Sequence, residues 1–126
     1  MVAENITVLI IENDQHTREL YQRFLKRFYR VFSCCNESEA LEVVQTHSVS
    51  TIILEPASPD GQGWALLEKL RALPQTAETP IILCSTQDVR RRGIELGATL
   101  FLLKPVLPNA LYSAIRQLLV GTARAV

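Results

Sequence analysis

The sequence predicts an α/β fold in which a parallel five-stranded sheet lies between two layers of helices. Five short apolar runs recur along the 126 residues, and polar or turn residues bound each of them, which is typical of strands. A segment whose apolar residues recur at helical spacing follows each run. Residues 51–54 form a run without polar alternation, as expected of a strand that helices cover on both faces. This alternation indicates βαβ units with right-handed crossovers.

The five predicted strands are short and rich in Val, Ile, Leu and Phe. We expect them at residues 6–11, 29–34, 51–54, 80–84 and 99–103. Pro80 stands at the first position of the fourth strand, where the missing N–H of proline is tolerated.

Capping residues and apolar spacing predict where the first two helices lie. Asn13 or Asp14 can cap the first helix by accepting backbone N–H bonds. We expect this helix to bury Leu20, Phe24, Leu25 and Phe28. The second helix is expected over residues 36–46, with one apolar stripe formed by Ala40, Leu41, Val43 and Val44.

Proline and glycine delimit the remaining three helices. A helix over residues 63–73 stops at Pro74, and a short helix over residues 88–96 ends at Gly97. The last helix begins at Pro108, which suits a first turn. Its predicted buried face consists of Leu111, Ala114, Ile115 and Leu118.

Composition and length are those of one globular domain. Hydrophobic residues make up 48% of the chain and charged residues 21%, which is ordinary for a soluble protein. We expect a single domain over residues 1–126, with a core at about 6–119 and a frayed tail over 121–126. The sequence shows no signal peptide and no apolar run of membrane-spanning length. A cytoplasmic location without membrane contact is therefore expected.

The charges balance, since Lys and Arg together number 13, as do Asp and Glu. A domain that neutralises phosphates needs a basic excess, so we expect no nucleic acid binding by this domain. The run Arg90, Arg91 and Arg92 is interpreted as a solvated helix face. Three cysteines cannot all pair within one chain, and none has the spacing of a zinc site. Buried thiols in a reducing compartment are expected.

Polar side chains follow four of the predicted strands at the point where each strand ends. Glu12 and Asn13 follow the first strand, Glu55 the third, Ser85 the fourth and Lys104 the fifth. Because functional groups of open α/β sheets gather at the carboxyl ends of the strands, we expect these side chains to lie around one site.

The ordered set of motifs resembles the receiver domain of bacterial two-component response regulators. It consists of Glu12-Asn13-Asp14 after the first strand, Glu55-Pro56-Ala57-Ser58-Pro59 after the third, Ser85 after the fourth, Gly97-Ala98, and Phe101 followed by Lys104-Pro105. The resemblance covers residues from about 6 to 119. It implies a flavodoxin-like fold with strand order 2-1-3-4-5, and a signalling module rather than an enzyme.

The resemblance also implies a role for each of these residues. Glu55 stands at the position that accepts a phosphoryl group, beside an acidic pocket formed by Glu12, Asn13 and Asp14. Ser85 and Phe101 stand at the switch positions, and Lys104 at the position of the phosphate-facing lysine. Pro105 is the candidate for a cis peptide bond. The implied partners are a histidine kinase or an output domain, with a homodimer as a further option.

Two departures from the family pattern predict a degenerate receiver. Glu55 replaces the aspartate of the family, and its extra methylene moves the carboxylate by roughly 1.5 Å, into the space of the phosphoryl group or metal. Asn13 replaces a charged metal ligand. We therefore expect no cofactor, and Mg²⁺ at Glu12, Asn13 and Glu55 only in a working receiver. Asp14 is interpreted as a helix cap. The helix before Gly97 is about one turn short.

Three functional hypotheses follow from the sequence. In the first, the domain is a degenerate receiver and a binding module, in which Glu55 reaches Lys104 and Ser85. In the second, it is a working receiver whose Glu55 accepts phosphoryl with Mg²⁺. In the third, it is a small α/β nucleotide-binding protein or enzyme, although no glycine-rich loop follows the first strand.

Overall fold

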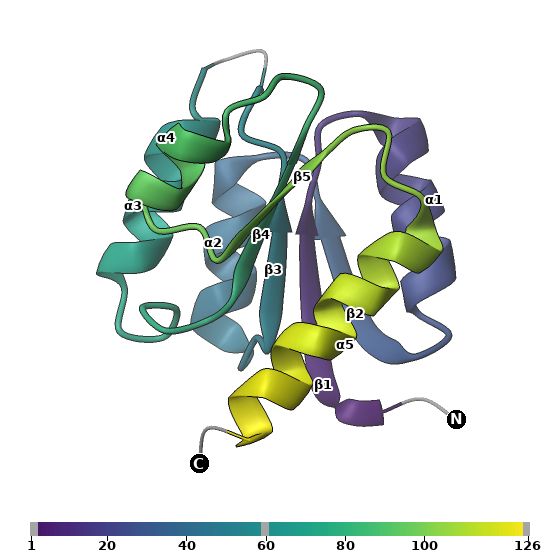
Figure 1. Ribbon diagram of the computed structural model, residues 1–126. Helices are drawn as coiled ribbons and strands as arrows, with labels where there is room; N and C mark the ends of the chain where they lie inside the picture. Colours follow the sequence, from purple (N-terminus) through teal and green to yellow (C-terminus); the bar gives the residue numbers. More distant parts are fainter. Residues whose placement is uncertain (1–2, 59–60, 125–126) are drawn as a thin grey trace.

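The computed structural model describes residues 3–58 and 61–124. Its five strands are β1 (Ala3–Ile11), β2 (Tyr29–Cys34), β3 (Thr51–Leu54), β4 (Ile81–Ser85) and β5 (Leu100–Leu103). They pair in parallel in the order β2-β1-β3-β4-β5 (Figure 1). The predicted strand order is therefore confirmed.

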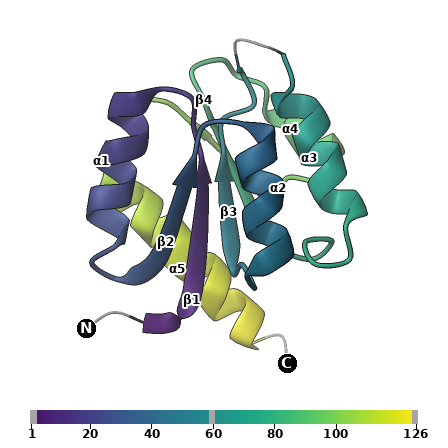
Figure 2. The ribbon, with the colours of Figure 1, turned by 180° about the vertical axis from the view of Figure 1, so that it is seen from behind.

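Five helices alternate with the strands, as predicted. They are α1 (Gln15–Leu25), α2 (Glu37–Thr46), α3 (Gly63–Ala72), α4 (Arg90–Glu95) and α5 (Pro108–Arg124). Helices α1 and α5 cover one face of the sheet, while α2, α3 and α4 cover the other (Figures 1 and 2). The molecule is thus the three-layer α/β sandwich that the alternation of patterns predicts.

The central sheet separates two apolar cores. Successive side chains of a strand point to opposite faces, so Ile53 packs with Leu25 and Leu111 on the α1–α5 side. Its neighbours Ile52 and Leu54 pack with Leu67 on the other side. All four residues of β3 are buried. Because both faces of the strand are covered, its sequence shows no alternation of apolar and polar residues.

The first helix differs from its sequence-based prediction. Its buried residues are Tyr21 and Leu25, whereas Leu20 is 47% exposed, so the prediction for Leu20 was wrong. The two buried residues are four apart and share a face, and Leu20 is turned away from that face by one helical step. Phe28 lies in the loop after α1 and packs on the core from there.

Several element boundaries also differ from prediction. Strand β4 is Ile81–Ser85, so Ser85 is its last residue, and α4 is only Arg90–Glu95. Strand β1 begins at Ala3, and its pairing with β2 is irregular between Ala3 and Thr7. Helix α5 continues to Arg124, so residues 121–124 of the expected tail are helical, and 125–126 lie outside the described residues. Within the described ranges, no helix is both long and apolar enough to cross a membrane.

The short helix α4 lies directly on β4. Gly93 is buried, and a Cβ there would lie 2.4 Å from Leu83 Cδ1, so a side chain there would require Leu83 or the helix to shift. Gly97 follows the helix with a φ of +108°, a conformation that favours glycine after a helix end. The six-residue length of α4 confirms the prediction of a short helix.

Candidate functional site

The strand register brings the predicted site residues to one edge of the sheet. Ile11 pairs with Leu54, and Leu54 with Leu83. The residues after the strands extend the backbone ladder, because Glu55 N–H donates to Ile11 O at 3.0 Å and Lys104 N–H donates to Ser85 O at 2.8 Å. The backbones that carry these side chains are therefore fixed by the sheet itself.

Lys104 forms a buried ion-pair cluster with two carboxylates. Its Nζ donates to Glu12 Oε1 at 2.5 Å and to Glu55 Oε1 at 3.1 Å. The side chains of Lys104, Glu12 and Glu55 are only 12%, 3% and 7% exposed. Interactions between charges withdrawn from water are strong, and they keep the three groups in one arrangement.

Backbone amides engage the second oxygen of each carboxylate. Asp14 N–H donates to Glu12 Oε2 at 3.2 Å, and Ala57 N–H donates to Glu55 Oε2 at 3.1 Å. All four carboxylate oxygens of Glu12 and Glu55 therefore have a donor. Sequence reasoning did not identify these two amides, because a backbone N–H leaves no mark on residue type.

Burial and the neighbouring charges act in opposite directions on Lys104. Burial opposes its charge, but the hydrogen bond and charge of Glu12, and then those of Glu55, outweigh burial and raise the pKa of Lys104 above 10.5. Burial also raises the pKa of Cys84, whose thiol lies just before the site, to about 12. Near neutral pH the ammonium is thus charged and the thiol protonated.

Asp14 serves as the helix cap rather than as a member of the ion-pair cluster. Its Oδ2 accepts from Thr17 N at 2.9 Å and from Thr17 Oγ1 at 2.6 Å. These two hydrogen bonds, led by that from the hydroxyl, lower the pKa of Asp14. Arg18, one turn further along α1, donates to Glu12 O at 2.8 Å and fixes the turn. No sequence pattern predicted this role of Arg18.

The residues at the switch positions are buried close to the cluster. Ser85 is 1% exposed, and its Oγ accepts from Gln87 N at 3.3 Å. This contact differs from the predicted one, in which Glu55 reaches Ser85. Phe101 is buried in the core on the α2–α4 side, with the Arg90 guanidinium 5.6 Å from its ring centroid. The Lys104–Pro105 peptide bond is cis.

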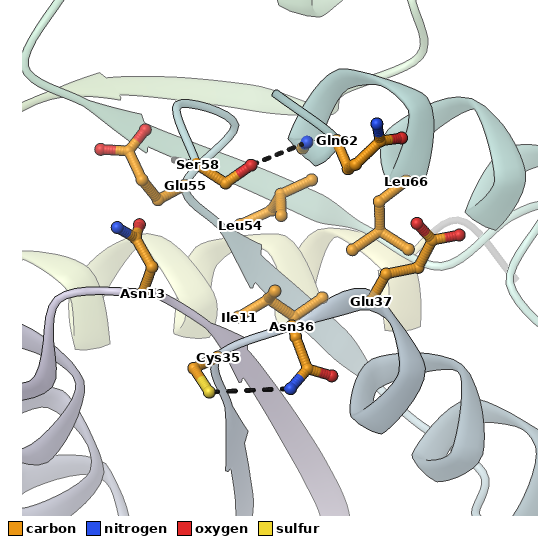
Figure 3. Close-up of a pocket in the computed structure, with 11 residues that line it drawn as sticks. Ile11, Asn13, Cys35, Asn36, Glu37, Leu54, Glu55, Ser58, Gln62 and Leu66 are labelled. Atoms are coloured by element: carbon orange, nitrogen blue, oxygen red, sulfur yellow. Dashed lines mark hydrogen bonds between the residues drawn. The ribbon is translucent and has the colours of Figure 1, made fainter. Parts of the chain in front are cut away.

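A small cavity lies beside Glu55, toward α2 and α3. About 30 Å³ of it is open to the centres of water-sized groups, which is enough to hold ordered water. In Figure 3, Glu55 and Asn13 stand at one end, and Ser58 accepts a hydrogen bond from the Gly63 amide at 3.2 Å. Gly63 is required there, since a Cβ would lie 2.0 Å from Pro56 O.

The resemblance implies a Mg²⁺ ion at this edge, where the carboxylates already have a cationic partner. Magnesium needs oxygen ligands in octahedral geometry, yet both carboxylates of the cluster are bound to Lys104 and Asn13 is neutral. Among residues 3–58 and 61–124, no group of three or more His, Cys, Asp or Glu side chains is arranged to hold a metal ion. The ammonium of Lys104 supplies the positive charge at this site.

Comparison with known sequences identifies related proteins. The family model of the response regulator receiver domain matches residues 8–116. The chain is 33% identical over 116 residues to the probable transcriptional regulator ycf27 of Cyanidium caldarium, covering 89% of this chain and 45% of that protein. It is 32% identical over 123 residues to the transcriptional regulatory protein GltR of Pseudomonas aeruginosa, covering 94% and 51%. The chain thus spans about half the length of these two relatives.

Solved structures give the same picture of the fold. The chemotaxis protein CheY4 of Vibrio cholerae superimposes with a TM-score of 0.82 and 25% identity, covering 89% of this chain and 97% of that one. A CheY-like receiver domain protein of Methanospirillum hungatei superimposes with a TM-score of 0.86 over 96% of this chain and 98% of that one. Its identity is 21%, so it supports the fold alone.

Proposed function

The chain belongs to the response regulator receiver domain family, and from that premise we propose that it is a degenerate receiver of a two-component system. In this proposal the domain does not cycle through metal-dependent phosphorylation. It acts as a protein-interaction module whose Lys104–Glu12–Glu55 cluster stands where the family places a metal ion and a phosphoryl group.

The observation that carries the proposal is the position of Lys104 Nζ between Glu12 and Glu55, at 2.5 and 3.1 Å. One ammonium already offsets the charge of both carboxylates. A divalent cation would have to displace it from both, in a site where the three side chains are almost fully shielded from water.

The state of Glu55 also disfavours phosphoryl transfer. A carboxylate that attacks phosphorus needs one free oxygen in line with the leaving group. Oε1 of Glu55 accepts from Lys104 and Oε2 accepts from Ala57 N–H, so each oxygen is already held by one hydrogen bond. The extra methylene of glutamate moves the carboxylate by roughly 1.5 Å relative to aspartate, and such displacements cost on the order of a hundredfold in rate.

The same contacts suggest what the cluster does instead. The cluster holds the turns after β1, β3 and β5 in one arrangement. In this proposal the surrounding surface therefore keeps one conformation, in which it binds a protein partner. Receiver domains interact with histidine kinases or output domains, and the two named relatives, of which this chain spans about half, are described as transcriptional regulators. We propose a partner of one of these two classes.

Phosphorylation in vitro tests the proposal. After incubation with acetyl phosphate and Mg²⁺, phosphate-affinity gels and intact mass should show the native protein unmodified. The variant E55D combined with N13D restores a shorter acid and a charged metal ligand, and it should gain an acid-stable, base-labile phosphoryl group. E55Q combined with N13D is the matched control and should stay unmodified.

Stoichiometric phosphorylation of Glu55 in the native protein would contradict the proposal. It would establish the second candidate instead, a working receiver, which the presence of Ser85, Lys104 and the cis Lys104–Pro105 bond at the family positions favours. In that case the ion pairs to Lys104 would have to open when the metal binds.

A further inference from the structure

We propose that a basic–aromatic patch formed by the end of α1, the turn that follows it and α5 is a docking surface for an acidic segment of a partner protein. The patch consists of Arg23, Lys26, Arg27 and Arg116 around the rings of Phe24, Phe28 and Tyr112. It lies on the face covered by α1 and α5, around the α1–β2 loop, which is at the opposite end of the sheet from the loop that carries Lys104 (Figure 1).

Aromatic contacts join α5 to the end of α1 and to the turn that follows it. The rings of Phe28 and Tyr112 stack with centroids 4.2 Å apart, and Phe24 meets Tyr112 edge-on at 6.4 Å. The guanidinium of Arg27 lies 5.5 Å from the centroids of both Phe24 and Phe28. The three rings are half-buried, so the scaffold under the charges is rigid.

The cations lie close together along the chain at the end of α1. Arg23 lies in the last turn of α1, Lys26 is the C-cap residue of that helix, and Arg27 lies in the turn that follows it. Arg116 follows Tyr112 by four residues on α5, and its charge acts on the nearby phenol of Tyr29. All four cationic side chains are exposed.

These four charges have no carboxylate partner within the described part of the chain. The ion pairs there involve Lys69, Arg91 and Lys104 but no member of the patch. Glu19, one turn before Arg23, instead accepts from Gln15 Nε2 at 3.0 Å. Because the formal charges of the whole chain sum to zero, these unpaired cations form a local excess of positive charge. The negative end of the α1 dipole relieves only part of their mutual repulsion.

The chemistry of the patch favours carboxylates on a protein over other anions. Nucleic acid binding by base stacking would need free ring faces. In the patch, Arg27 lies over the rings of Phe24 and Phe28, and Phe28 stacks on Tyr112. A membrane surface would need exposed apolar side chains beside the cations, and the large exposed ones, Leu20, Ile94, Leu103, Leu107 and Val120, are not members of the patch. Arginine and aromatic residues are enriched at the centres of protein interfaces.

Titration of the isotope-labelled domain with a designed peptide tests the proposal by NMR. The probe is a short peptide of repeated Glu-Glu-Leu, and the control is its Gln-Gln-Leu counterpart. At low salt the acidic peptide should shift the amide signals of residues around 23–30 and 112–116, and the neutral peptide should not. Raising the salt concentration should weaken the effect, because exposed charges are screened.

Matched variants assign the binding to the patch. R23Q combined with R27Q should weaken binding of the acidic peptide about tenfold, since it removes two charge-assisted contacts. R90Q combined with R91Q makes the same change of charge on α4 and should leave binding within about twofold of native. Circular dichroism of both variants establishes that the fold is retained, and R116Q offers an independent single change on α5.

Four outcomes would overturn the proposal. The first is that the acidic peptide shifts only signals of α4, and the second is that the neutral peptide binds equally well. The third is that an oligothymidylate or phosphatidylglycerol vesicles bind the patch more tightly than the acidic peptide. The fourth is that the domain self-associates and that R23Q/R27Q abolishes this self-association. None of these results depends on phosphorylation at Glu55, so the two proposals succeed or fail separately.

Discussion

At the scale of single residues, the site depends on one lysine that satisfies two buried acids. Lys104 is the cation for both Glu12 and Glu55, and each acid also accepts one backbone amide. A buried ion pair of this kind adds little stability relative to an apolar replacement of the whole set, but losing one member leaves the others uncompensated. The lysine is therefore expected to matter far more than a lysine at the surface.

The variant K104M should lower the free energy of unfolding by about 3–5 kcal/mol at neutral pH, because two buried carboxylates lose their counter-ion. Urea denaturation followed by circular dichroism measures the change. K69M is the matched control, since Lys69 pairs with Glu37 at the surface, where its side chain is 55% exposed, and should change stability by less than about 1 kcal/mol. If K104M and K69M lowered the free energy of unfolding equally, the buried cluster would contribute no more to stability than a surface ion pair.

At the scale of elements, helix α4 is held by contacts that compensate for its short length. A helix of six residues has little stability of its own. The guanidinium of Arg92 lies 4.2 Å from the ring centroid of Trp64 on α3, and Gly93 lets the helix lie against Leu83. The arginine run that the sequence suggested to be a solvated face therefore includes a contact that ties α4 to its neighbour.

Replacing Arg92 by Ala should loosen α4, because it removes a cation–π contact worth about 0.5–1 kcal/mol at an exposed site. Hydrogen exchange of the α4 amides should accelerate, and the fluorescence of Trp64 should change. The control R91A removes only the exposed ion pair with Glu95 and should leave both signals near native values. An equal response to R91A and R92A would show that the ring contact does not hold the helix.

At the scale of the whole molecule, stability should decline with alkaline pH. The buried thiol of Cys84 has a pKa of about 12 in the folded protein, against an ordinary value of 9.0. Between these values the thiol ionises in the unfolded chain but stays protonated in the folded one, so the unfolded state binds fewer protons and stability falls as pH rises. Lys104 acts in the same direction above pH 10.5, because its pKa is raised.

The Cys84 contribution should appear as a slope of at most about 1.4 kcal/mol per pH unit between pH 9 and 12. Urea denaturation at several pH values, under reducing conditions, measures it in the native protein and in C84A. The variant loses packing and is less stable throughout, but its stability should fall less steeply with pH. Parallel curves for the two proteins would mean that this thiol ionises alike in both states.

Sequence patterns were sufficient for the layers of the molecule but not for its detailed contacts. The strands could be predicted because β-branched runs such as residues 51–54 are unusual outside a buried sheet. Proximity of Glu12, Glu55 and Lys104 followed from parallel pairing. The partner of Ser85 and the exposure of Leu20 could not be predicted, because both depend on the tertiary positions of loops and helices. The early start of β1 depends on an irregular pairing that no local pattern encodes.

The route taken by Lys104 across the sheet has a mechanical consequence. Lys104 directly follows β5, which is an edge strand that pairs with β4 in the described sheet, yet the lysine reaches acids that follow β3 and β1. Edge strands ordinarily fray alone, at little cost to the rest of a domain. Here, peeling the carboxyl end of β5 must break two charged contacts anchored at the centre of the sheet. Unfolding of β5 is thereby coupled to unfolding of the central strands β1 and β3, and the domain is expected to unfold cooperatively.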